Sequence, residues 1–72
     1  MELVKNKASG KYFVVLDDDG NDDFLVVTPE GKIKRLERRL FGPRDIVDPQ
    51  KTRRIRKLTQ MQVDKYLEYT NE

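Results

Sequence analysis

Two runs of β-branched and aromatic residues, KYFVVL at 11–16 and FLVVT at 24–28, lie on either side of the acidic segment DDDGNDD. Each run is too short for a stable helix, and its residue types are those enriched in strands. Aspartate, glycine and asparagine between two such runs are typical of a tight connection, in which Gly20 can supply a positive φ angle. The sequence therefore predicts a β-hairpin here, and with it an antiparallel sheet.

The segment after this hairpin allows two interpretations. TPEG at 28–31 predicts a turn, because proline presets φ at the first central position and Gly31 can adopt the left-handed conformation. In KIKRLERRLF at 32–41, the apolar residues fall at helical spacing. As a strand, the same residues would pair with the strand before the turn, with a bulge because Ile33 is out of phase with the leucines. The turn favours a strand and the periodicity a helix, so both stay open.

The remaining elements follow from shorter signals. Residues 1–9 are expected to form a loose N-terminal or edge segment, although Leu3 and Val4 could dock on a sheet. RDIVD at 44–48 predicts a short strand, and residues 51–57 could form a last one. A helix is expected at 59–70, where Thr59 and Gln62 have the spacing of a capping box.

These elements predict one small, mainly β (α+β) domain over residues 1–72, with the sheet within 11–57 and one C-terminal helix. The order of short strands followed by a terminal helix resembles an SH3-like small barrel, an arrangement shared by chromo, Tudor and KOW-type modules. The resemblance implies an SH3-like antiparallel barrel or meander sheet. It rests on element order alone, so it transfers no functional residues. The alternative is a ββαβα order, with a helix at about 32–41.

Composition narrows the chemistry available to the chain. It has no cysteine and no histidine, which removes disulfides, thiol nucleophiles, zinc sites of the usual Cys/His type and histidine bases. The aspartates at 17–23 do not match an EF-hand, because valines fall where two ligands belong. We expect no enzyme, no catalytic residues, no cofactor and no metal. The N-terminus lacks the apolar core of a signal peptide and no apolar run approaches a membrane span, so a cytoplasmic location is expected.

The charges are unevenly distributed along the chain, although the net charge is only +2. Residues 1–31 have three basic and seven acidic side chains, whereas residues 32–57 have eleven basic and three acidic ones. Such asymmetry indicates an anionic partner, or association between unlike surfaces.

The leading functional hypothesis is a small intracellular module that binds nucleic acid or another polyanion through the basic residues of 32–57. Phosphate neutralisation dominates such binding, and the planar guanidinium of arginine suits phosphate. The predicted contacts are Lys34, Arg38, Arg39, Lys51, Arg53, Arg54, Arg56 and Lys57. The competing interpretation is that these side chains pair with the acidic first third of the chain, where Asp22 or Asp23 could reach arginines of a neighbouring strand.

The alternative function is a protein–protein adaptor or a self-associating domain that uses the C-terminal helix or a sheet edge. The apolar arc of the helix covers more than half of its circumference, which is broad for packing on one small sheet. The residues expected at this interface are Met61, Val63, Tyr66 and Tyr69.

Overall fold

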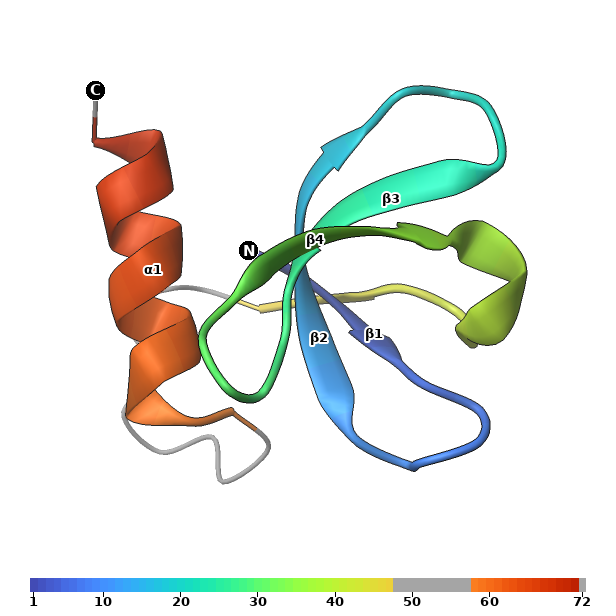
Figure 1. Cartoon of the computed structure of the whole chain (residues 1–72), viewed down its shortest axis with the longest axis horizontal. Helices are drawn as coiled ribbons and strands as arrows, with labels where there is room; N and C mark the ends of the chain where they lie inside the picture. Colours follow the sequence, from blue (N-terminus) through green and yellow to red (C-terminus); the bar gives the residue numbers. More distant parts are fainter. Residues whose placement is uncertain (48–57, 72) are drawn as a thin grey trace.

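The computed structural model describes residues 1–47 and 58–71. These residues form five antiparallel strands in one sheet and one C-terminal helix (Figure 1). The elements are β1 (Glu2–Lys5), β2 (Tyr12–Asp18), β3 (Asp23–Val27), β4 (Ile33–Glu37), the 3₁₀ helix η1 (Arg38–Leu40), β5 (Asp45–Ile46) and α1 (Gln60–Thr70). The strand order is β4-β3-β2-β1-β5. The expectation of a mainly β chain with one C-terminal helix is confirmed.

The predicted hairpin is the pair β2–β3, whose register runs from Val14↔Val27 to Asp18↔Phe24. Gly20 has a φ of 77° in its turn, a value that glycine adopts without steric cost. The register shifts between Val15 and Asp17, which marks an irregularity of the bulge type in β2. This shift places Asp18 opposite Phe24.

Residues 32–41 form a strand, Ile33–Glu37, followed by a short 3₁₀ helix, so the strand interpretation of this range is confirmed and the alternative of a helix is wrong. β4 pairs with β3 without interruption from Val27↔Ile33 to Asp23↔Glu37, and the expected bulge is absent from this pairing. Ile33 is out of phase with Leu36 because the two side chains lie on opposite faces of the strand. Ile33 accordingly remains 42% exposed.

The N-terminal residues are part of the sheet, and the expectation of a loose segment over 1–9 is therefore wrong for β1. This strand pairs with β2 on one side and with β5 on the other. Leu3 and Val4 have exposed fractions of 0% and 1%, because they face opposite sides of a strand that has a neighbour at each edge.

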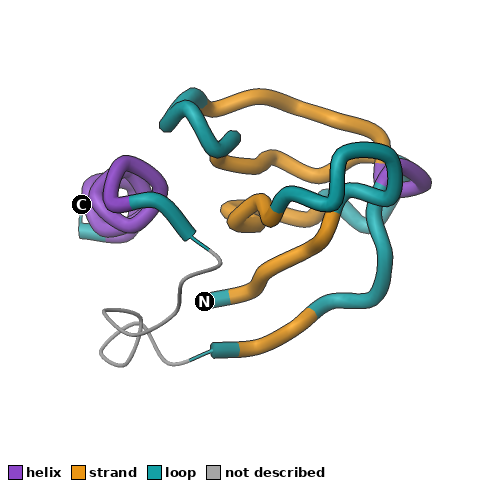
Figure 2. Tube along the Cα trace, turned by 90° about the horizontal axis from the view of Figure 1, so that it is seen from below, coloured by secondary structure: helices purple, strands orange, loops and turns teal. Residues whose placement is uncertain are grey.

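The two faces of the sheet hold separate apolar clusters. One contains Val4, Val15, Phe24 and Val26, together with Phe41 from the segment after η1. The other contains Leu3, Val14 and Val27, against which Leu58 and Tyr66 pack. Figure 2 shows that α1 lies beside this strongly curved sheet. Within the described residues β4 and β5 do not pair, so the sheet is open and the predicted SH3-like barrel is not confirmed.

The C-terminal helix begins where its capping signal predicts. The Thr59 hydroxyl accepts a hydrogen bond from the Gln62 backbone N–H, and the Gln62 side chain accepts one from the Thr59 N–H. The short strand predicted at 44–48 is confirmed for Asp45–Ile46. The possible strand at 51–57 lies outside the described residues. No helix in the described ranges is long and apolar enough to cross a membrane.

Candidate polyanion-binding site

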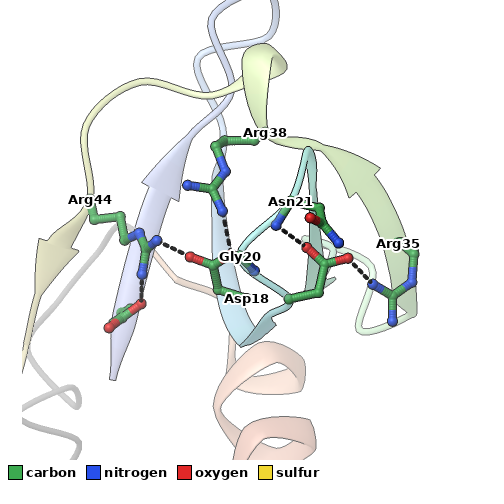
Figure 3. Close-up of polar contacts among 8 residues, drawn as sticks. Asp18, Gly20, Asn21, Arg35, Arg38 and Arg44 are labelled. Atoms are coloured by element: carbon green, nitrogen blue, oxygen red, sulfur yellow. Dashed lines mark hydrogen bonds and ion pairs between the residues drawn. The ribbon is translucent and has the colours of Figure 1, made fainter.

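The acidic turn between β2 and β3 is an electrostatic partner of the arginines that follow it in the chain (Figure 3). The Asp18 carboxylate pairs with both Arg38 and Arg44. Arg44 also donates to Glu2 over 2.8 Å, and Arg35 pairs with Asp19 at 3.3 Å. This arrangement supports the predicted internal pairing between acidic and basic residues. The aspartates that take part are Asp18 and Asp19, however, and not the predicted Asp22 or Asp23.

An aromatic ring lies beneath this charge cluster. The guanidinium carbons of Arg38 and Arg44 are 4.8 Å and 5.0 Å from the centroid of the Phe24 ring, within the range of a cation–π contact. A hydrogen bond from the Gly20 backbone N–H lowers the pKa of Asp18, and a hydrogen bond from Arg44 and the two guanidinium charges lower it further. The hydrogen bond to Glu2 and the contact with Asp18 raise the pKa of Arg44. Each charged group in the cluster therefore stabilises the ionised form of its partners.

Arg39 pairs with Glu37. Together with the pairs of Arg35, Arg38 and Arg44, this means that each arginine in the described ranges makes an ion pair. The predicted contacts Arg38 and Arg39 both belong to η1, but only Arg39 is highly exposed, with 81% of its side chain accessible. A polyanion would have to compete with carboxylates for these guanidinium groups. They are consequently weaker candidates for phosphate contacts than the sequence suggested.

The lysines of the strands and turns differ from these arginines in their lack of ion pairs with described carboxylates. In an antiparallel meander the β1–β2 turn and the β3–β4 turn leave the sheet at the same end, opposite the acidic turn, as Figure 1 shows. Five exposed lysines lie in these turns or at the strand ends beside them, and none makes an ion pair with a described carboxylate. We call this group the lysine end; its members are Lys5, Lys7, Lys11, Lys32 and Lys34. The predicted contact Lys34 belongs to it.

Backbone hydrogen bonds fix the first of the two turns, at residues 6–11. The Asn6 side-chain oxygen accepts from the N–H groups of Ala8 and Ser9, at 3.0 and 2.9 Å. The Asn6 N–H donates to the Lys11 carbonyl at 2.8 Å, and Gly10 has a φ of 71°. The lysines of this turn therefore project from an ordered backbone.

The second turn is closed in the way its sequence predicts. The Thr28 N–H donates to the Lys32 carbonyl, and the Gly31 N–H donates to the Thr28 carbonyl, both at 2.8 Å. Gly31 has a φ of 81°, the left-handed conformation expected for it. The first turn of α1 lies against this turn, because the Thr59 hydroxyl donates to the Pro29 carbonyl at 3.1 Å.

A shallow groove of about 350 Å³ lies between these two turns. The side chains of Phe13 and Leu36 contribute its apolar lining, and both are half-buried. Its polar lining comes from Asn6, Ser9, Lys11, Thr28, Glu30 and Lys34, with Pro29 beside them. The groove thus combines an apolar surface with two lysines, Lys11 and Lys34, that make no ion pair with a described carboxylate.

Glu30 is the one acidic residue in the sequence of the two turns. A hydrogen bond from its own backbone N–H lowers the pKa of this carboxyl, followed by a hydrogen bond with Thr28 and by the charges of Lys11 and Lys34. The carboxylate is therefore ionised at neutral pH and can accept hydrogen bonds within the groove.

Five predicted nucleic-acid contacts lie outside the described residues: Lys51, Arg53, Arg54, Arg56 and Lys57. Their charge is nevertheless informative. The described residues contain ten basic and eleven acidic side chains, whereas the other eleven residues contain five basic and two acidic ones. The net positive charge of the chain therefore comes from the segment that precedes Leu58.

The residues predicted for a protein interface all lie on α1, but they do not form one exposed face. Tyr66 packs against the buried cluster of Leu3, Val14 and Val27, and Val63 is half-buried. Met61 and Tyr69 are 54% and 44% exposed. The broad apolar arc of the sequence is thus divided between packing and exposure.

Comparisons with protein-family models, with curated proteins and with solved structures found no match to this chain. Among the described residues there is no group of three or more carboxylates close enough to hold a metal ion.

Proposed function

We propose that this protein is a small module that binds polyanions, above all the phosphate backbone of nucleic acid, through the lysine end. The observation that carries the proposal is the division of the basic side chains. The described arginines make ion pairs with carboxylates, whereas none of the five lysines at one end of the sheet makes an ion pair with a described carboxylate. The Glu30 carboxylate lies close enough to Lys11 and Lys34 for their charges to lower its pKa, but it offsets only one of the five positive charges.

The proposed mechanism is electrostatic. Lysine ammonium groups act as point charges on flexible stems, and each phosphate they neutralise releases a condensed counterion. Such contacts read no base sequence, so this part of the interaction is expected to be general for phosphate polymers.

The basic segment 51–57 is proposed to add to the same interaction. Leu58, which follows it directly, packs on the sheet, and Thr59 contacts the turn at 28–31. The chain therefore re-enters the described structure beside the lysine end. Arg53 and Arg54 remain the first residues of this segment to test.

The test is fluorescence anisotropy of labelled single-stranded and duplex oligonucleotides, titrated at about 50 and 200 mM salt, a range over which phosphate-driven affinity falls steeply. We expect Lys11→Ala/Lys34→Ala to weaken binding to both oligonucleotides. The matched control is Lys65→Ala, because Lys65 lies on α1 and pairs with Glu68 at 3.3 Å. Wild-type affinity in the double variant, or no binding by the wild-type protein at 50 mM salt, would contradict the proposal.

A protein–protein adaptor is the second candidate, favoured by the exposure of Met61, Leu67 and Tyr69. At about 100° per residue, Met61 and Tyr69 lie about 80° apart around the helix, whereas Leu67 lies on another side. These side chains do not form one stripe, and for this reason the lysine end is preferred.

A further inference from the structure

On the sheet face that carries Phe13, the aromatic side chain at the groove is more exposed than the others. Phe24 and Phe41 on this face are 3% and 5% exposed, whereas Phe13 remains half-buried and lines the groove. Its ring is held by an edge-type contact with Phe41, with the centroids 5.2 Å apart. Single-strand binders stack bases on accessible aromatic rings within basic grooves, and here the Phe13 ring lies beside Lys11 and Lys34, which make no ion pair with a described carboxylate.

The size and charge of the groove narrow the ligand further. Its volume of about 350 Å³ falls at the lower end of the range of about 300–1,000 Å³ found for small-molecule sites. The ammonium groups of Lys11 and Lys34 suit phosphates on either side of a base. In a duplex the bases are stacked and paired, so only the backbone could reach these lysines.

Glu30 provides a means of base discrimination. Its ionised carboxylate lies among the residues that line the groove, and carboxylates accept hydrogen bonds from the exocyclic amino group of cytosine. Thymine presents a carbonyl oxygen at the same position, which a carboxylate repels. An acidic peptide would bring further carboxylates towards Glu30, so the charge arrangement favours a nucleobase over such a peptide.

We infer that this groove receives an unpaired base of single-stranded nucleic acid, which contacts Phe13 and whose amino group donates to Glu30, while Lys11 and Lys34 bind the adjacent phosphates. The inference rests on the proposed function, since it specifies the ligand of the same end of the molecule. It makes the module selective for single strands, with a preference for cytosine over thymine.

The test compares four probes of equal length: oligo-dC, oligo-dT, an abasic oligonucleotide and a duplex. We expect the wild-type protein to bind oligo-dC about five- to tenfold more tightly than oligo-dT. This ratio corresponds to the lower part of the discrimination that a good contact to a base edge provides. The abasic strand and the duplex are expected to bind more weakly than oligo-dC, because they offer phosphates without an accessible base.

Two variants separate the base contacts from the charge. Phe13→Leu keeps an apolar side chain and the net charge, and it should weaken oligo-dC binding at least about fivefold, the lower limit for loss of one stacked base. Unchanged binding to the duplex and an unchanged midpoint of thermal unfolding would show that this variant still folds. Glu30→Gln should abolish the preference for cytosine over thymine, because an amide can donate to the thymine carbonyl as well as accept.

The outcomes distinguish the two proposals. If the wild-type protein binds none of the four probes, the proposed function fails and the inference fails with it. If it binds all four with equal affinity and Phe13→Leu changes nothing, the base site is wrong while the lysine end stands. Binding of an acidic peptide as tightly as oligo-dC, with the same sensitivity to Phe13→Leu, would also overturn the base site.

Discussion

The side-chain amide nitrogen of Gln62 lies 2.8 Å from the carbonyl oxygen of Tyr12, and this hydrogen bond connects α1 to the sheet. The same nitrogen donates to the Val27 carbonyl at 3.2 Å, while the Gln62 side-chain oxygen accepts from the Thr59 N–H. Gln62 is only 1% exposed. One side chain therefore caps the helix, satisfies backbone groups of two neighbouring strands and fixes the helix at the lysine end.

Replacing Gln62 by leucine should destabilise the fold markedly. The substitution removes the side-chain donor to the part-buried Tyr12 carbonyl and the buried Val27 carbonyl, and half of the capping box. Each buried group deprived of its partner costs about 1–3 kcal/mol. We expect a loss of about 2–4 kcal/mol in the free energy of unfolding, measured by urea denaturation. The control is Gln60→Leu on the exposed side of α1, expected within about 0.5 kcal/mol of wild type. Equal stabilities of the two variants would contradict this role of Gln62.

The conformation of Gly31 provides a second stability test with an internal control. Gly20 and Gly31 have similar positive φ angles of 77° and 81°, so alanine incurs comparable backbone strain of about 1–2 kcal/mol at either position. A Cβ on Gly31 would lie 3.0 Å from Met61 Cβ, whereas one on Gly20 would have nothing within 4 Å. We expect Gly31→Ala to be the more destabilising in urea titrations, because it also displaces the first turn of α1. A larger effect of Gly20→Ala would show that this contact is unimportant.

The Asp18 cluster predicts how stability changes in acid. Hydrogen bonds and the neighbouring arginines lower the pKa of Asp18 in the folded protein, so its stabilising contribution is complete above the ordinary aspartate pKa of about 4 and is lost as the pH falls through the lowered value. Asp18→Asn should therefore reduce stability at pH 7 and make the decline between about pH 5 and pH 2 shallower.

The measurement is the urea midpoint as a function of pH for the wild-type protein and Asp18→Asn. Asp64→Asn is the matched control, since Asp64 is on the exposed side of α1 and accepts from Gln60 over 2.9 Å. A pH dependence identical in all three proteins would contradict the linkage.

Local sequence signals were sufficient for the β2–β3 hairpin and for α1. Turn residues such as Gly20 and the Thr59–Gln62 capping pair act over a few positions, so they can be recognised without knowledge of the fold. The region 32–41 was ambiguous because its apolar spacing suits a helix, whereas pairing with β3 determines the strand. Tertiary context overrides such periodicity in short segments.

Other features depended on neighbours that are distant in sequence. The run ELVK is too short and too polar at its end to indicate a strand, and its burial follows from its place between β2 and β5. The partners of Arg38 and Arg44 depend on the register shift in β2, which brings Asp18 opposite Phe24.

Four members of the lysine end were not among the predicted contacts: Lys5, Lys7, Lys11 and Lys32. They come from two turns that are far apart in the chain and are brought to one end only by the meander. This grouping could not be predicted because β1 was not recognised as a strand. Had residues 2–5 been identified as a strand, alternation of the chain direction would have placed both turns at the same end of the sheet.

The most direct test of the proposed function is the salt dependence of single-stranded oligonucleotide binding by the wild-type protein and by Lys7→Ala/Lys11→Ala/Lys34→Ala. Each phosphate contact contributes about 0.7 to the slope of log affinity against log salt for single strands, so loss of three contacts should reduce its magnitude by about 2. Lys65→Ala should leave the slope unchanged. An unaltered slope in the triple variant would show that the lysine end does not bind phosphate.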